Sequence, residues 1–256
     1  MRRFLALVSV AIVVILSLST PIAAAVPTVH PGKGQPEFEK FVFVHYDADF
    51  AKKGGRGNGN PKLYSYSGYH WASDTVPYRI NLAGTRVAAA EAIVSITASF
   101  QSWQDDPGSS ITFDYQGETA DYSPGVNVSS PDYVNVVGWA DLSQSYPDAI
   151  AITVIWATRG SKRVVDCDTA LNTDAYFAWA QADIIGDPDG AYLAPTSFYD
   201  VDVQNIMTHE AGHWLQLNDL YSPAATEETM YGYAADRELK KRSLEEGDLA
   251  GARDIY

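Results

Sequence analysis

Residues 202–217 constrain the fold most, because their pattern predicts a buried helix that carries polar side chains. The pentapeptide HEAGH lies at residues 209–213, with apolar residues on both sides. Asp202 is a suitable N-cap, since its carboxylate can accept hydrogen bonds from the first free backbone N–H groups. Histidines four positions apart lie one turn above each other on the same helical face. The core must therefore form around a helix that holds two imidazoles side by side.

The rest of the chain has the pattern of a mixed α/β domain. Helices are expected at residues 87–103, 202–217 and 244–256, the last begun by a capping box at residues 243–246. Short strands are expected at residues 76–81, 111–115, 133–139, 150–156 and 164–171, of which 150–156 is apolar enough to be central. We predict an α/β (α+β) fold with three main helices and a mixed twisted sheet of about five strands.

The start of the chain is typical of an export signal, which we assign to residues 1–25. Arg2 and Arg3 precede an apolar run at residues 4–18, and three alanines at residues 23–25 offer a cleavage site. The run is shorter than the roughly 20 residues that a membrane-spanning helix needs. An uncleaved anchor is the alternative, but we expect a secreted protein that has no membrane contact after cleavage.

The next segment, residues 26–60, is interpreted as an N-terminal segment and a possible propeptide. Its stretch of residues 40–49 contains a strand candidate at residues 41–44, and a Gly-rich linker follows at residues 54–61. The main domain then covers residues 61–256.

Charge and cysteine content exclude several classes of protein. The net charge is −14, which argues against nucleic acid and anionic membranes as partners. Cys167 is the only cysteine, so no disulfide can form within the chain, and we expect it to be a small buried apolar residue. We expect a monomer.

The pentapeptide predicts a zinc site with His209 and His213 as ligands. Glu210 lies on the neighbouring helical face, from which it can reach a water activated at the metal and act as a general base. A catalytic zinc usually has three protein ligands and one open position. His213 is the last histidine of the chain, so the third ligand is of another type. Asp219 is the best candidate, provided that the chain turns just after the helix.

Residues 209–219 resemble the metzincin motif, in which a third ligand, His or sometimes Asp, follows the second His by six residues. The sequence TMYGY at residues 229–233 resembles the Met-turn of the matrixins, which would put Met230 under the zinc. The helix expected at residues 244–256 resembles the matrixin C-terminal helix, and residues 71–113 resemble the start of that catalytic domain. The resemblance to matrixin-like metzincins covers residues 63–256.

The resemblance implies a metzincin-like catalytic domain that acts as a secreted zinc-dependent metalloendopeptidase. Its substrate would be a peptide or protein, bound as an extended strand along an edge of the sheet. His209, His213 and Asp219 would hold one Zn²⁺, and Glu210 would pass the proton of the attacking water to the leaving amine. Matrixins also carry calcium before the catalytic helix, and Asp183, Asp187 and Asp189 are candidates, although solvated turn acids are the more common interpretation.

Two features depart from the matrixin pattern. Gln216 stands where the family has glycine at a sharp turn, so the turn is strained or differently built, or Asp219 approaches by another path. The inhibitory propeptide cysteine is also missing. If residues 26–60 are a propeptide, they must inhibit differently. Asp47 or Asp49 could cap the metal, but an ordinary strand end is the favoured interpretation.

Three other functions remain to be weighed. A gluzincin-type peptidase would use Glu227 or Glu228 as its third ligand, which the Met-turn and the position of Asp219 argue against. A non-catalytic binding or adhesion module on a metzincin fold is disfavoured by the intact pentapeptide. A structural zinc site needs four closed protein ligands, which are hard to find with one Cys and no His after His213.

Overall fold

The computed structural model describes residues 37–48, 63–180 and 199–256, which all belong to one compact unit, Pro36–Tyr256. The predicted export signal, the linker at residues 54–61, Asp49 and the calcium candidates Asp183, Asp187 and Asp189 lie outside these residues. Among the helices that the structure describes, none has both the length and the apolar character needed to cross a membrane.

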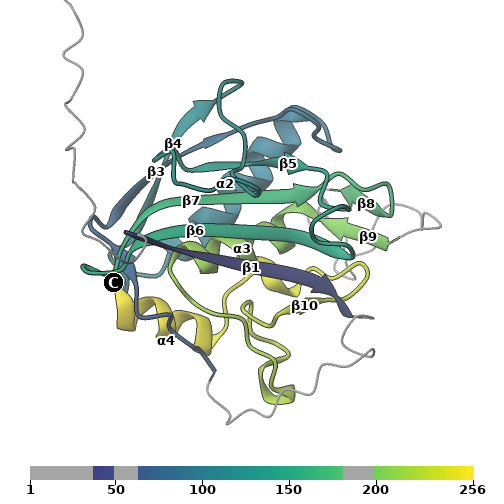
Figure 1. The fold of residues 1–256 in the computed structure, drawn as a ribbon. Helices are drawn as coiled ribbons and strands as arrows, with labels where there is room; N and C mark the ends of the chain where they lie inside the picture. The colour runs from purple at the N-terminus through teal and green to yellow at the C-terminus, as the bar shows by residue number, and fades with distance from the viewer. Residues whose placement is uncertain (1–36, 49–62, 181–198) are drawn as a thin grey trace, which may run out of the picture. The chain divides into compact units, whose positions relative to one another are not determined.

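A mixed sheet of eight strands organises this unit (Figure 1). Its strands are β1 (Phe38–Asp47), β2 (His70–Trp71), β3 (Thr75–Ile80), β4 (Thr112–Glu118), β5 (Val136–Ala140), β6 (Ala149–Thr158), β7 (Arg163–Asn172) and β10 (Tyr233–Ala234). They are ordered β10-β1-β6-β7-β5-β3-β4, and β2 pairs with β7. β6 runs antiparallel to both of its neighbours, and the other pairs are parallel. A separate parallel pair consists of β8 (Phe177–Ala180) and β9 (Tyr199–Asp202).

The expectation of about five strands in the sheet is wrong, because the sheet has eight. All five expected strands are present, as β3 to β7, and β6 is an interior strand as predicted. β2 and β10 have two residues each, which is too short to leave an alternating pattern in the sequence. The third additional strand, β1, comes from the segment that the sequence separates from the main domain.

The three expected helices are confirmed as α2 (Ala89–Gln104), α3 (Val203–Trp214) and α4 (Glu246–Ile255). Asp202 caps α3 as predicted, since its Oδ1 accepts the N–H of Asn205 at 2.7 Å. The predicted start of the last helix is wrong, because Glu245 and not Ser243 is its N-cap. Asp248 accepts the N–H of Glu245 at 3.0 Å, whereas the N–H of Ser243, two residues earlier, donates to the Lys240 carbonyl and not to a capping side chain.

Helices α2 and α3 pack against the same face of the sheet, behind it in the view of Figure 1. An aromatic cluster joins the layers, with the ring centroids of Phe100 in α2 and Trp214 in α3 5.0 Å apart and those of Phe100 and Tyr78 4.3 Å apart. Cys167 of β7 is buried in this core, as predicted. This packing holds α3, the helix that carries both histidines, against the sheet.

Candidate metal centre

His209 and His213 lie one turn apart on α3, and both side chains are fully buried. The Nδ1 atom of His209 lies 2.7 Å from the carbonyl oxygen of Thr229, and that of His213 lies 2.7 Å from the carbonyl oxygen of Leu217. A carbonyl oxygen can only accept a hydrogen bond, so each Nδ1 carries the proton. Each Nε2 therefore keeps its lone pair and is available as a metal ligand.

The chain turns directly after α3. The N–H groups of Gln216 and Leu217 donate to the carbonyls of His213 and Gly212 at 2.8 and 3.1 Å, which is the Schellman arrangement of a helix end. Gln216 has a φ of 72°, so the turn is strained rather than rebuilt. Ser67 compensates in part, because its Oγ donates to Gln216 Oε1 at 3.0 Å and its N–H to the Gln216 carbonyl at 3.0 Å.

This turn brings Asp219 back to both histidines. Its Oδ1 lies 3.2 Å from His209 Nε2 and 3.6 Å from His213 Nε2. None of these three atoms has a hydrogen-bond partner within the described part of the chain. Three converging lone pairs repel one another unless a cation or added protons lie between them. Two imidazoles and one carboxylate form a donor set that fits a zinc ion.

The pKa shifts of these groups differ from one another. Burial lowers the pKa of His209 to about 4, which favours the neutral ring that binds metals. Burial also lowers the pKa of His213, but Asp219, Glu210 and the Leu217 carbonyl together raise it above its ordinary value. Burial alone would raise the pKa of Asp219, yet the two neighbouring imidazoles hold it well below its ordinary value. Asp219 is therefore an ionised carboxylate, and a bound metal cation would take the place of the proton that His213 otherwise shares with it.

Met230 supports α3 at Gly212, against which it is fully buried. A Cβ atom added to Gly212 would lie 2.1 Å from Met230 Sδ, so no larger side chain fits without movement. The Met230 loop is fixed by Asp248, which accepts the N–H groups of Thr229 and Met230 at 2.7 and 3.1 Å. The predicted Met-turn thus lies against the predicted metal helix.

A hydrogen-bond chain from the sheet orients Glu210. Glu210 Oε2 accepts from Thr153 Oγ1 at 2.5 Å, and Thr153 Oγ1 lies 2.7 Å from Thr169 Oγ1. The indole N–H of Trp214 can only donate, and it lies 2.9 Å from Thr169 Oγ1. The chain of donors therefore runs from Trp214 through Thr169 and Thr153 to the carboxylate. Burial raises the pKa of Glu210 to about 7, which suits a group that exchanges protons near neutral pH.

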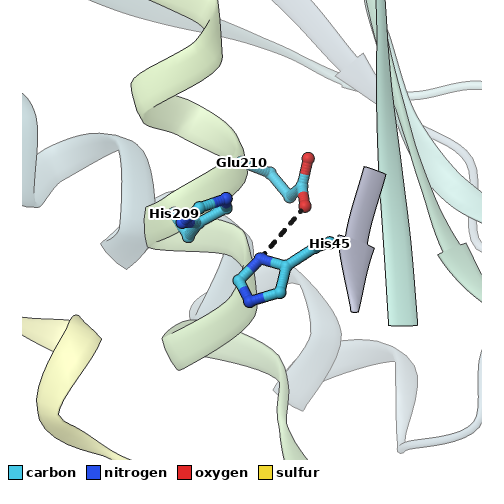
Figure 2. A group of neighbouring side chains, drawn as sticks. All are labelled: His45, His209 and Glu210. Atoms are coloured by element: carbon cyan, nitrogen blue, oxygen red, sulfur yellow. Dashed lines mark ion pairs between the residues drawn. The ribbon is translucent and has the colours of Figure 1, made fainter. Parts of the chain in front are cut away.

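A third histidine reaches this centre from β1 (Figure 2). His45 Nδ1 lies 3.6 Å from Glu210 Oε1, and the rings of His45 and His209 are 3.9 Å apart between centroids. His45, His209 and Glu210 form a second group whose ligand atoms all lie within 4.8 Å of one another. The sequence interpretation missed His45, although residues 41, 43 and 45 alternate along the predicted strand and so share a face.

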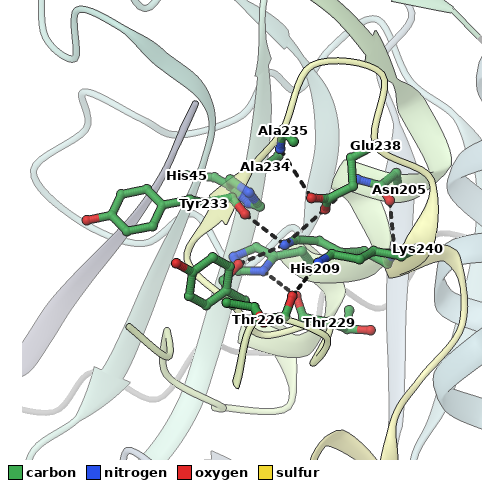
Figure 3. A network of polar contacts seen from close by, with 12 residues as sticks. His45, Asn205, His209, Thr226, Thr229, Tyr233, Ala234, Ala235, Glu238 and Lys240 are labelled. Carbon is green, nitrogen blue, oxygen red and sulfur yellow. Dashed lines mark hydrogen bonds and ion pairs between the residues drawn. The ribbon is translucent and has the colours of Figure 1, made fainter. Parts of the chain in front are cut away.

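The buried Lys241 links the Met230 loop to β10 beside this centre. Its Nζ donates to the carbonyls of Tyr231 and Tyr233 at 2.9 Å each, and lies 3.2 Å from Glu238 Oε1. Figure 3 shows the network of polar contacts here, with Glu238 beside Asn205 and Ala235. The sequence interpretation missed Lys241 as well, because a lysine gives no sign of burial until its partners are known.

The other candidate ligands do not reach the histidines of α3. The side chain of Glu227 is 75% exposed and pairs with Lys240, and Glu228 accepts the N–H of Asp248 at 3.2 Å. Asp47, at the end of β1, pairs through its backbone with Ala234 of β10. Within the described ranges, the groups suited to a metal contain none of these three acids.

No protein-family model matches this chain, and no curated protein matches it.

Proposed function

We propose that this chain is a zinc-dependent peptidase of the metzincin type, with His209, His213 and Asp219 as metal ligands and Glu210 as general base. One observation carries the proposal. Three buried atoms, His209 Nε2, His213 Nε2 and Asp219 Oδ1, converge next to the carboxylate of Glu210. One oxygen of that carboxylate, Oε1, accepts no hydrogen bond from the described residues. The Met230 loop against Gly212 and the turn that returns Asp219 add support. The predicted export signal makes the proposed peptidase a secreted one.

Each protein group has a defined part in the proposed hydrolysis. A bound zinc ion supplies Lewis acidity to the scissile carbonyl and acidifies an adjacent water. Glu210 takes a proton from that water through Oε1, which the Thr153 contact leaves free, and later gives the proton to the leaving amine. Asp219 supplies one negative charge to the centre, and the two neutral histidines add none.

A structural metal site is the second candidate, and a specific observation favours it. His45, His209, Glu210 and His213 are all fully buried, and His45 is the additional histidine that a four-ligand site needs. A closed four-ligand site would stabilise the fold without catalysis. The gluzincin alternative loses support, because Glu227 and Glu228 are engaged elsewhere.

The test compares metal content and peptide cleavage in the chain from residue 26 onward. We expect about one zinc per chain, and cleavage of a peptide mixture either directly or after trimming of the N-terminal segment. Glu210→Gln should keep the zinc and lower cleavage by about 10²-fold to 10⁴-fold, because only the proton transfer is lost. Asp219→Ala should weaken zinc binding at least about tenfold.

Glu227→Gln is the matched control, since its exposed carboxylate should affect neither zinc nor cleavage. Unchanged zinc binding in Asp219→Ala would exclude Asp219 as a ligand. Zinc without cleavage in the trimmed chain would favour the structural site, and a chain that binds no zinc would overturn the metal centre itself.

A further inference from the structure

β1 runs antiparallel along β6 and faces α3 with every second side chain. Phe43 pairs with Thr153, the residue that holds Glu210, and His45 pairs with Ala151. Because alternate side chains of a strand point to the same face, Phe43 and His45 lie on one face of β1. The register shifts only after His45, where Tyr46 pairs with Ala149 and Ile150 of β6 is skipped. The strand therefore presents both Phe43 and His45 to the metal centre.

These two side chains cover the centre from the β1 side. The Phe43 ring stacks on the His213 ring, with centroids 4.1 Å apart and an angle of 13° between the planes. His45 lies against His209 and Glu210, as described above. His209, Glu210 and His213, which these side chains contact, have no exposed surface. In this arrangement a peptide substrate has no access to the histidines.

His45 has unsatisfied bonding capacity where it lies. Both of its ring nitrogens are buried, and neither has a hydrogen-bond partner among the described residues. Glu210 Oε1, 3.6 Å away, is in the same state. Burying an imidazole unpaired costs free energy that an apolar side chain would avoid. A purely structural position in β1 has no need of histidine, so the ring's chemistry points to the metal centre.

We propose that β1 is a built-in occupant of the metal centre, whose His45 imidazole takes the place of the attacking water between the metal and Glu210. In this state the centre is closed and inactive, and β1 must leave β6 before a substrate is cut. The departure would also expose the backbone N–H and C=O groups of β6, which can bind an extended peptide by strand pairing. This inference rests on the proposed function and adds its regulation.

The experiment uses the chain from residue 26 onward, loaded with Co²⁺ as a visible reporter of the metal, with acetohydroxamate as the probe. This small chelator binds a metal only through an open coordination position. We expect little spectral change in the parent. His45→Ala should bind the probe at least about tenfold more tightly than the parent, because the position beside Glu210 opens. Val44→Ala, on the opposite face of β1, is the matched control and should resemble the parent.

Phe43→Ala is a second variant, needed if His45→Ala does not fold. It removes the ring stacked on His213, and we expect probe binding between that of the parent and that of His45→Ala. Equal probe binding by the parent and the folded variants would overturn the proposal. Cleavage by His45→Ala above that of the parent would support it further.

Failure of the proposed function gives a different result. If the parent and His45→Ala bind the metal and differ in probe binding, but neither of them nor the chain trimmed of residues 26–60 cleaves peptides, β1 closes the centre and the chain is not a peptidase. If the chain binds no Co²⁺ or Zn²⁺, both proposals fail together.

Discussion

The candidate metal centre is built from two regions that differ in how the sequence encodes them. The first is the segment from α3 to Asp219, in which the two histidines, Glu210 and the turn all lie within eleven positions of the chain. The second is β1, which contributes His45 from far upstream through pairing with β6. Helical spacing is a local property, so the first region could be predicted from a few residues. Strand register depends on a distant partner, and no local pattern states it.

The difference also concerns how each region is held. The α3 segment is fixed on several sides, by Met230, by the hydrogen-bond chain to Glu210 and by the Ser67 contacts at its turn. β1 is held by its backbone pairing with β6 and β10 and by side chains on its two faces. β1 lies between β10 and β6, and only two of its residues pair with β10. In the proposal above, the α3 segment is the permanent half of the centre, and β1 is the half that can be displaced.

The largest effect is expected at Lys241, where the two regions meet. Its ammonium holds the carbonyls of Tyr231 and Tyr233, and Tyr233 pairs with Tyr46 of β1. Lys241→Met would leave these carbonyls and Glu238 without their cation in a buried place. We expect the free energy of unfolding to fall by about 3–5 kcal/mol, measured by urea denaturation.

Lys240→Met is the control for this prediction, because it removes the same group one position earlier. Lys240 is 35% exposed and pairs with the exposed Glu227, so its loss should cost about 1 kcal/mol or less. Equal losses in the two variants would show that the Lys241 network does not tie the Met230 loop to β10.

A smaller effect is expected at Gly212, inside the predictable region. The Cβ of Gly212→Ala would lie 2.1 Å from Met230 Sδ and 2.8 Å from Trp103 Cζ2, so both side chains must move. Overpacking costs about 1–3 kcal/mol, and the better helix propensity of alanine returns up to about 1 kcal/mol. We expect a net loss of about 1–2 kcal/mol in the free energy of unfolding, with weaker zinc binding.

Gly160→Ala supplies the matched comparison, since a Cβ at that exposed turn meets nothing within 4 Å. Its free energy of unfolding should change by about 0.5 kcal/mol or less. If Gly212→Ala proves equally neutral, Met230 does not support the metal helix.

The site residues that the sequence predicted have partners nearby in the chain, and those that it missed have distant partners. The N-cap at Asp202, the two histidines, Glu210 and the return of Asp219 were accessible, because each depends on neighbours within one or two turns. The helix start at Glu245 was missed by two residues, since Asp248 is also recruited by the Met230 loop. His45, Thr153 and Lys241 acquire their roles only from partners on other elements. A sequence read alone cannot pair those elements.

Buried carboxylates extend the comparison to the opposite face of the sheet. Asp166 and Asp168 of β7 are buried, and within the described part of the chain the hydrogen bonds that they accept come from backbone N–H groups, such as those of Gly125 and Tyr133. Without an adjacent cationic or imidazole partner, burial raises the pKa of Asp166 to about 6 and that of Asp168 to about 8. The same residue type is thus stabilised as an anion on one face and disfavoured as an anion on the other.

These raised pKa values predict the smallest effect, a pH dependence of stability. In the folded chain these two carboxyls bind more protons than in the unfolded chain between pH 4 and 8, because their folded pKa values of about 6 and 8 exceed the ordinary aspartate value of 3.8. Stability from this pair therefore falls as pH rises through that window. The side-chain oxygen of Asp166→Asn can still accept the N–H groups of Asp132 and Tyr133. Its NH₂ group then replaces Oδ1, which has no hydrogen-bond partner among the described residues. Relative to the parent, its free energy of unfolding should rise by about 1–2 kcal/mol between pH 4 and pH 8.

Urea denaturation at the two pH values, with a chelator present, checks this prediction without metal binding. The histidines of the centre titrate in both chains, so their contribution cancels in the difference. Asp121→Asn, at an exposed position, should change the free energy of unfolding little at either pH. A difference between Asp166→Asn and the parent that stays constant with pH would mean that Asp166 keeps an ordinary pKa in the folded chain. Asp219 and Asp166 would then differ only in metal binding, and not in the pKa that each face of the sheet gives a buried carboxyl group.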